Sequence, residues 1–471
     1  MPRSPEWKKV EKLIEEAKFE EARQAVAAIR EQAQKADNGE DWTEALIKEV
    51  QLTSAQHGYE TSVRFLREQS WPQDLLSQAT LELFYAQSLM TYLSQYSWEI
   101  NKREKVESKG TVDLKSWTKE QIYLEAQKAY ARLWPIRAQL GEQPVRALAP
   151  LLTPNDYPDG IRGTLRDALG YLWVELLANT QAWTPAQSNE VFRLDLKKLL
   201  ATDGSDREIK LEDPAPHPIE KLVAVLADLE RWHGQSGHTE AALEARLVRI
   251  ERLHGAFTDR GDRALLRTQL EEVLGKHRSV AWWAKGQAQL ARMVQQDEGD
   301  QVRAHALAAQ GHSQLPDTVG GRRCLSIARE IEQPHFAMSG VLVDAAQKRS
   351  IQVRHKNLRT LYFRAYPYDL KQRIGTATDY NLLPAYREMR ELLEIDIAAA
   401  ECPEGNEKRS GSWMSTAHDV PREGRGRPTV RLTSCTSTCE RARIASARFP
   451  PIAASPPSAS ANRMPTRKII D

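Results

Sequence analysis

Apolar side chains recur with the period of an α-helix along most of the first 333 residues. Two such stripes lie at residues 10–17 and 22–33, and both follow the spacing i, i+3, i+4, i+7. Ser4 is suited to cap the first helix, and Pro5 to occupy its first position. Because the break between the stripes is short, we expect two antiparallel helices, a helical hairpin.

A helix-start signal recurs in three places. Trp42-Thr43, Trp117-Thr118 and Trp183-Thr184 each precede an apolar-periodic run. The second and third pairs are followed by Gln121 and Gln187, which predicts capping boxes of the Thr-x-x-Gln type. The spacings between the three signals are unequal, so we interpret them as shared capping chemistry and not as a sequence repeat.

Residues 75–96 are apolar on two sides, which predicts a helix buried between neighbours, as in a stacked solenoid. The surrounding stretch 71–134 contains ten aromatic residues. Aromatic packing between helix layers is the favoured interpretation of this stretch, and a ligand groove is the alternative.

Proline-rich breaks at 144–158 and 214–218 divide the helical region. Beyond the second break the pattern predicts a hairpin and three further helices, at Ile219–Trp232, Thr239–Leu253, 262–275, 279–295 and 300–310. The fold class expected is mostly α, a right-handed stack of antiparallel helical hairpins that resembles tetratricopeptide arrays without their fixed period. We expect two helical arrays, residues 5–213 and 214–333.

The apolar period changes from 3.6 to 2 near residue 335. Ile351 and Val353 alternate with polar neighbours, and residues 361–366 alternate in the same way. This alternation is typical of half-buried antiparallel strands, so residues 336–370 are expected to supply two or three strands. We expect residues 334–400 to form an incomplete β domain. Its unpaired strand edges would make it the least stable part of the chain.

Residues 401–471 have a different composition. Arg, Ser, Pro, Ala and Thr make up 41 of these 71 residues, and apolar periodicity is lost. Two interpretations stay open for this tail: a native disordered segment, or out-of-frame translation after a frameshift. The second is preferred, because the change falls inside a β domain that needs its remaining strands.

Charge and hydropathy exclude few classes of function. The chain of 471 residues has a formal net charge of +2, with 12 Lys and Arg against 7 Asp and Glu in the tail. Near-neutrality gives no reason to expect a nucleic-acid partner. No apolar run reaches the ~20 residues that span a bilayer. The N-terminus carries no signal peptide, so the chain is cytoplasmic at face value.

The sequence predicts no catalytic, cofactor-binding or metal-binding residue, and therefore a protein that is not an enzyme. His233 and His238 bracket a Gly-Gln-Ser-Gly turn, and we interpret this pair as part of a solvated loop and not as a metal site. Cys435 and Cys439 have no second pair at zinc-site spacing. No phosphate-binding loop, dinucleotide fingerprint, HExxH motif or nucleophile elbow is present in the sequence.

The layout resembles the N-terminal part of bacterial alpha-2-macroglobulin-like proteins, over about residues 7–395. In that family a helical extension precedes the first macroglobulin-like β domain. The similarity rests on the following segments: Trp7–Val10, Phe19–Ala22, Leu83–Trp98, the Gly320-Gly321 turn before Cys324, Ile331–Pro334, Val353–Asn357 and Leu361–Arg364.

The resemblance implies a periplasmic or secreted protein whose family role is endopeptidase inhibition by protease trapping. Some family members carry an internal Cys–Gln thioester. Cys402-Pro-Glu-Gly405 is superficially similar to that motif, but Gly405 stands where the glutamine must supply the acyl group, so no thioester is expected here. No site residue of the family is carried over to this chain.

Two hypotheses on function follow. The first is a non-enzymatic N-terminal fragment of an alpha-2-macroglobulin-like protein, with proteases or other proteins as partners. The alternative is a free-standing helical-repeat scaffold that binds a protein partner in its groove. Neither hypothesis involves nucleic acid, a membrane span or a cofactor, and the sequence does not indicate an oligomeric state.

Overall fold

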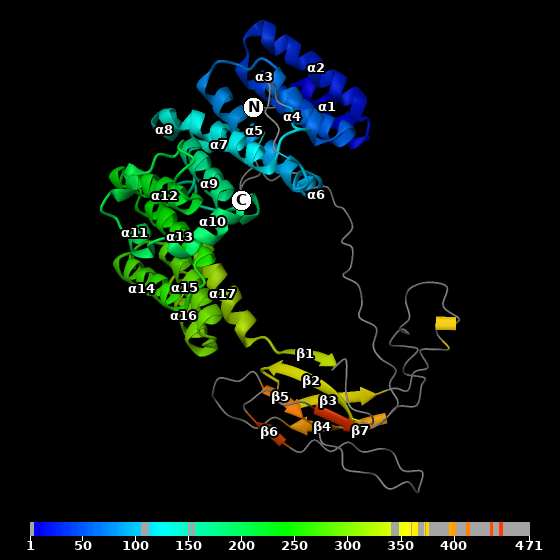
Figure 1. Cartoon of the computed structure of the whole chain (residues 1–471), viewed down its shortest axis with the longest axis vertical. Helices are drawn as coiled ribbons and strands as arrows, with labels where there is room; N and C mark the ends of the chain where they lie inside the picture. The colour runs from blue at the N-terminus through cyan, green and yellow to red at the C-terminus, as the bar shows by residue number, and fades with distance from the viewer. Residues whose placement is uncertain are drawn as a thin grey trace. The chain divides into compact units, whose positions relative to one another are not determined.

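The structure, a computed structural model, describes residues 4–104, 113–148, 151, 156–340, 348–358, 360–365, 372, 374–375, 395–401, 411–414, 434–436 and 442–445. These residues are mostly helical, and short strands follow the helices (Figure 1). Successive long helices pack on one another in the order α1, α2, α3, α4, α5, α7, α9, α12, α13 and α14. This stacking of helical hairpins is the helical-repeat fold that the apolar periodicity predicts.

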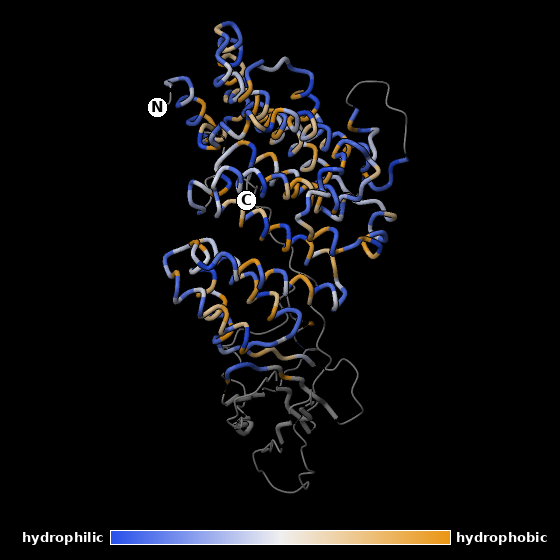
Figure 2. Tube along the Cα trace, turned by 90° about the vertical axis from the view of Figure 1, so that its left-hand side faces the viewer, coloured by the Kyte–Doolittle hydropathy of each residue, from blue (hydrophilic) through white to orange (hydrophobic). Residues whose placement is uncertain are grey.

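The first helices are α1 (Pro5–Glu15), α2 (Phe19–Ala36), α3 (Gly39–His57) and α4 (Tyr59–Glu68). Ser4 caps α1 as predicted, since its side chain accepts a hydrogen bond from Trp7 N. The apolar stripes of α1 and α2 meet α3 in one buried cluster that contains Val10, Val26 and Leu52. Orange, apolar positions therefore alternate with blue, polar ones along these helices (Figure 2).

The next helices are α5 (Leu75–Gln95), α6 (Ser97–Ile100) and α7 (Lys119–Leu133). Helix α5 buries side chains on several sides, as its sequence predicts. The capping box of Thr118 and Gln121 is confirmed at the start of α7. Trp42-Thr43, in contrast, does not start a helix. Asn38 caps α3 four residues earlier, because its side chain accepts from Asp41 N and the chain leaves α2 at Asp37 with little room for a loop.

Short elements occupy the middle of the array: η1 (Trp134–Ile136), α8 (Arg137–Gly141), η2 (Val145–Leu148), α9 (Leu165–Ala178), η3 (Thr180–Ala182), α10 (Pro185–Glu190), η4 (Val191–Arg193), α11 (Leu196–Leu200) and η5 (Ser205–Glu208). The second predicted capping box, Thr184 with Gln187, is confirmed in α10. The break at 144–158 separates α8 from α9, which is the longest helix of this region.

The last helices are α12 (Pro218–Gln235), α13 (Thr239–Ala256), α14 (Arg260–Lys276), α15 (Trp283–Asp297), α16 (Gln301–Gln314) and α17 (Val319–Glu332). Helices α12 to α16 match the predicted hairpin and the three patterns that follow it, and α17 is an additional helix. From the sequence, a turn between elements is expected at Gly320-Gly321. This prediction is wrong, because the pair lies within the first helical turn of α17. A Cβ atom at Gly320 would lie 2.1 Å from the backbone nitrogen of Lys285, so the glycine permits close contact with α15.

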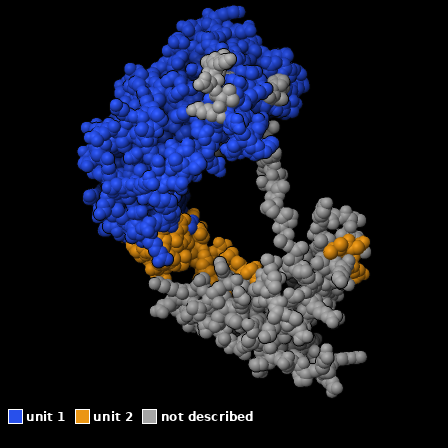
Figure 3. All heavy atoms as spheres, viewed as in Figure 1, with its two compact units in different colours: residues 1–293, 311–323, 464–471 blue, residues 294–310, 324–463 orange. Residues whose placement is uncertain are grey.

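The described residues form two compact units (Figure 3). The first unit contains the described residues of 1–293 and 311–323, and the second those of 294–310 and 324–463. The predicted boundary between helical arrays at residue 213 stays a prediction.

Strand β1 (His335–Gly340) pairs antiparallel with β2 (Lys348–Lys356), within the predicted strand region. Strand β3 (Thr360–Ala365) follows β2 closely in the sequence but pairs with β4 (Ile395–Glu401) and not with β2. Asn357 explains this arrangement, because it adopts a left-handed backbone with φ 56° and its Nδ2 donates to Ile331 O at the end of α17. The chain is thereby redirected immediately after β2.

Three further short strands lie in the C-terminal region: β5 (Gly411–Met414), β6 (Ser434–Thr436) and β7 (Ala442–Ala445). They extend the first sheet in the order β1-β2-β5-β6, with β7 also on β2. Apart from these strands and Glu401 of β4, the predicted disordered or out-of-frame tail, residues 401–471, lies outside the described residues.

Candidate binding cleft

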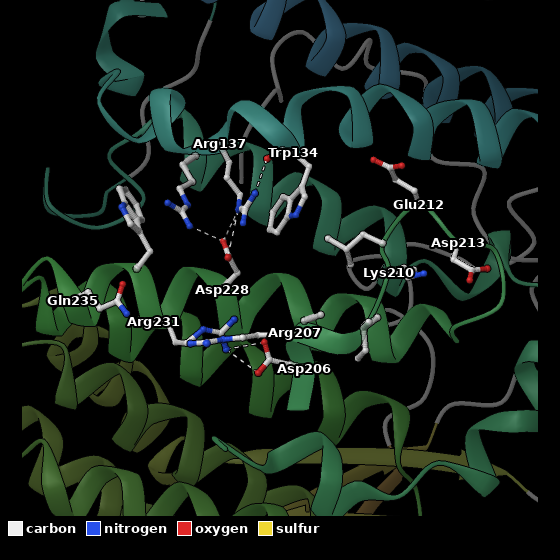
Figure 4. Close-up of a pocket in the computed structure, with 15 residues that line it drawn as sticks. Trp134, Arg137, Asp206, Arg207, Lys210, Glu212, Asp213, Asp228, Arg231 and Gln235 are labelled. Carbon is white, nitrogen blue, oxygen red and sulfur yellow. Dashed lines mark hydrogen bonds and ion pairs between the residues drawn. The ribbon is translucent and has the colours of Figure 1, made fainter. Parts of the chain in front are cut away.

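A cleft of about 710 Å³ lies within the first compact unit (Figure 4). Its residues come from η1, α8, α9, α12 and the segment 206–213. Helices α9 and α12 pack closely, and a Cβ atom at Gly170 of α9 would lie 2.5 Å from Leu229 of α12. The close packing fixes the spacing of the side chains that α9 and α12 direct into the cleft.

Two caps fix where α9 and α12 begin. Thr164 and Asp167 form a capping box at the start of α9, and His217 and Glu220 form one at the start of α12. Their sequence signals, Thr-x-x-Asp and His-x-x-Glu, lie outside the Thr-x-x-Gln pattern that the sequence analysis recognised. The first cap places Arg166 in the opening turn of α9.

Two arginines share one carboxylate at the centre of the cleft. Asp228 of α12 accepts a hydrogen bond of 2.7 Å from Arg166 Nη2. The same carboxylate accepts longer bonds, 3.3 and 3.4 Å, from Arg137 Nε. Arg137 Nη1 also donates to Trp134 O at 2.9 Å, so this side chain is held at both edges (Figure 4).

Each of these arginines lies over a tryptophan ring. The Arg137 Cζ atom is 4.5 Å from the centre of the Trp134 ring, and Arg166 Cζ is 4.5 Å from that of Trp232. Such stacking attracts the cation to the ring and restricts its rotation. Trp232 is itself held by Gly141, where a Cβ atom would lie 2.6 Å from Cζ2 of the indole.

A second ion pair and a charged rim complete the cleft. Arg231 Nη1 donates to Asp206 Oδ1 at 2.8 Å. On the segment after η5, Lys210 and Glu212 are exposed to solvent. Among the lining residues five are basic and four are acidic, so the cleft carries a small positive excess and both signs of charge. Such a surface suits a polar, charged ligand better than an apolar one.

A second charged cluster in the same unit is closed to solvent. Glu244 is fully buried and accepts from Arg162 Nη2 at 2.7 Å, Lys285 Nζ at 2.6 Å and Trp282 Nε1 at 2.7 Å. Burial alone would raise the pKa of Glu244, but the nearby charges of Lys285 and Arg162 outweigh it and hold the pKa below its ordinary value. We interpret this cluster as structural, since it joins α13 to α15 and to the loop before α9.

The histidine pair has two different environments. His238 is exposed, as predicted, but His233 is buried and its Nε2 lies 2.7 Å from Asp167 Oδ1. The prediction of a solvated loop is therefore wrong for His233, because α12 continues through it to Gln235 and turns it toward α9. Among the described residues, no group of three or more His, Cys, Asp or Glu side chains could hold a metal ion.

The aromatic stretch 71–134 is used mainly for packing, the favoured interpretation. Tyr130 stacks on Trp173 with ring centres 5.9 Å apart, and Trp71 meets Tyr85 edge to face. Trp134 contacts Trp173 and also lines the cleft, so the ligand-groove alternative stays a prediction for the end of the stretch.

The cysteines do not form a site within the described side chains. Cys324 is buried, and burial raises the pKa of its thiol to about 12, which makes it unreactive at neutral pH. The side chains of Cys402, Cys435 and Cys439 lie outside the described residues. In the part of the chain that the structure describes, no helix is both long and apolar enough to span a bilayer.

Comparisons of the chain with protein-family models, curated proteins and solved structures find no match. The similarity to alpha-2-macroglobulin-like proteins therefore stays a prediction. The helical-repeat fold and the cleft are the observations on which a function can be argued.

Proposed function

We propose that this chain is a non-enzymatic helical scaffold that binds a segment of a protein partner in the cleft between α9 and α12. The observation that carries the proposal is the pair of arginines, Arg137 and Arg166, held on tryptophan rings and directed at one carboxylate. Arginine and tryptophan are the residue types most often responsible for binding energy at protein interfaces. Stacks of helical hairpins commonly use such surfaces to bind partner segments.

The test is site-specific photo-crosslinking in cells of the natural host that express the chain with a crosslinking amino acid. A benzophenone amino acid at Lys210, an exposed residue of the cleft rim, is expected to give a discrete crosslinked protein. The matched control carries the same amino acid at Lys12 of α1, whose side chain is 75% exposed and lies outside the cleft. Identical adducts from both positions would contradict the proposal.

The second candidate function is endopeptidase inhibition by protease trapping, as part of an alpha-2-macroglobulin-like protein. It is favoured by the direct passage from α17 into the antiparallel pair β1–β2, because the family places its first β domain after a helical extension. A scaffold role for the helices is compatible with this assignment. Reading the gene beyond codon 395 in the other two frames tests it. Renewed β-sandwich sequence in another frame is expected, and an unrelated gene would contradict it.

A further inference from the structure

The central charges of the cleft are not balanced. Arg137 and Arg166 bring two positive charges to Asp228, which supplies one negative charge. Asp228 binds Arg166 closely, at 2.7 Å, and Arg137 only at 3.3 Å or more. A guanidinium group is best satisfied by a carboxylate that accepts two parallel hydrogen bonds. Arg137 thus has the capacity to bind a further carboxylate.

Arg166 also has a hydrogen-bond donor without an acceptor, and this donor is buried. Its side chain is 9% exposed, and its Nε atom, which is closed to solvent, donates to no partner among the described residues. An unsatisfied buried donor is costly, and in a native structure it requires an explanation. Because Nε itself is closed to solvent, an acceptor from the cleft would have to meet the Nη edge of Arg166. An acceptor placed there, beside Arg137, would add negative charge where it is lacking.

Both arginines are organised before any ligand binds. Trp134 and Trp232 hold the two guanidinium planes at 4.5 Å, and Gly141 leaves room for the Trp232 ring. Side chains that are already fixed lose little conformational entropy on binding. The site therefore favours an anion that two nearby guanidinium groups can bind together.

The rest of the cleft indicates that the anion belongs to a longer molecule. The volume of about 710 Å³ is much larger than one carboxylate group and lies within the range of pockets that hold ligands with several functional groups. Glu212 and Asp213 line the part of the cleft away from Gln235 (Figure 4). These carboxylates would repel a uniformly acidic ligand, so a single acid within a mixed sequence fits better.

We propose that the cleft binds its partner segment through one Asp or Glu side chain, whose carboxylate is bound jointly by Arg137 and Arg166. This inference rests on the proposed scaffold function and specifies the chemistry of the partner.

The experiment starts from peptides selected on the full-length chain from a random 12-residue display library. Each acid of a selected synthetic peptide is replaced by its amide, and the affinity is measured by fluorescence anisotropy. One acid is expected to account for a loss of about tenfold or more, which corresponds to one charge-assisted pair. Arg137→Gln is expected to lower the affinity for the original peptide by a similar factor. It is expected not to lower the affinity for the amide peptide any further, since the two changes remove the same interaction.

Two variants separate binding from folding. Arg137→Lys keeps the charge but loses the planar fork, so it is expected to bind less tightly than the natural chain. Arg64→Gln, on α4 and outside the cleft, is expected to bind as the natural chain does. Arg137 is about one third exposed, so its replacement is tolerated better than that of Arg166. Circular dichroism confirms the fold of each variant.

The contrary outcomes are distinct. If Arg137→Gln weakens the peptides but no amide replacement does, the carboxylate anchor is wrong and the scaffold function stands. If no selected peptide responds to Arg137→Gln, both proposals are wrong. If free glutarate binds as tightly as the peptides, the cleft is a small-molecule site and the inference is overturned.

Discussion

At the scale of single residues, the buried charges show how the fold constrains its polar side chains. Arg162 holds a left-handed backbone with φ 54°, which is unfavourable for a residue with a Cβ atom. Its guanidinium group lies 3.9 Å from the centre of the Tyr171 ring and bonds to Glu244. Contacts of this kind offset the cost of an unfavourable backbone conformation.

Glu244→Gln is expected to lower the free energy of unfolding by about 3–5 kcal/mol, because it leaves Lys285 and Arg162 buried without a countercharge. Urea unfolding followed by circular dichroism measures the change. The matched control is Glu251→Gln, an exposed carboxylate on the same helix, which is expected to change stability by less than about 0.5 kcal/mol. Equal effects of the two substitutions would show that the buried cluster is not stabilising.

The same carboxylate predicts a pH dependence. The folded chain holds the pKa of Glu244 below the ordinary value of 4.5, so the unfolded chain binds more protons in the acid range. The stability that Glu244 contributes is complete above pH 4.5 and is lost as the pH falls through the folded pKa. Unfolding curves measured between pH 3 and 6 are therefore expected to show that the free energy of unfolding falls more steeply with decreasing pH in the natural chain than in Glu244→Gln. Parallel pH profiles would contradict the assignment.

At the scale of elements, glycines determine how closely helices pack. Gly320 of α17 meets the backbone of α15, and Gly141 of α8 meets Trp232 of α12. Helix propensity alone would favour alanine at these positions. The close contacts reverse that preference, since a methyl group has no space there.

Gly320→Ala is expected to destabilise the chain by about 1–3 kcal/mol, because its Cβ atom would overlap the backbone at Lys285. Thermal unfolding measures the effect. Gly255→Ala in α13 serves as the control, since a Cβ atom there would meet nothing within 4 Å. That substitution is expected to be neutral or stabilising by about 0.5–1 kcal/mol. A lower stability of Gly255→Ala than of Gly320→Ala would contradict the packing argument.

At the scale of the whole molecule, the helices and the strands differ in how they are supported. Each long helix of the first unit packs on its neighbours in the series. Strand β1 lies at the edge of its sheet, and Phe336 and Met338 are 51% and 56% exposed. Small sheets with open edges and exposed apolar side chains are marginally stable.

Limited proteolysis is therefore expected to cut first within residues 334–400 and in the tail, and to leave a resistant helical fragment. Mass spectrometry of the products at short times identifies the first cuts. Survival of residues 340–370 for as long as the helices would contradict the prediction of an incomplete β domain. The gene beyond codon 395 provides an independent check on that domain.

The helices were predictable because their information is local. Periodicity in α1, α2, α12 and α13, and the caps at Ser4, Thr118 and Thr184, depend on residues a few positions apart. The misplaced start at Trp42 shows the limit of this approach, since a stronger cap at Asn38 competed for the same helix. The change of apolar period from 3.6 to 2 also identified the region near residue 335 as the point where strands begin.

Only the tertiary structure determined the cleft. Asp228 lies 62 residues from Arg166 and 91 residues from Arg137 in the sequence, and no local spacing relates them. The same holds for His233, whose partner Asp167 lies 66 residues away. The sequence specified the long periodic helices and their apolar faces through short-range contacts. The juxtaposition of charges followed from how α9 and α12 pack, because contacts between distant helices depend on their spacing and rotation and not on any local pattern.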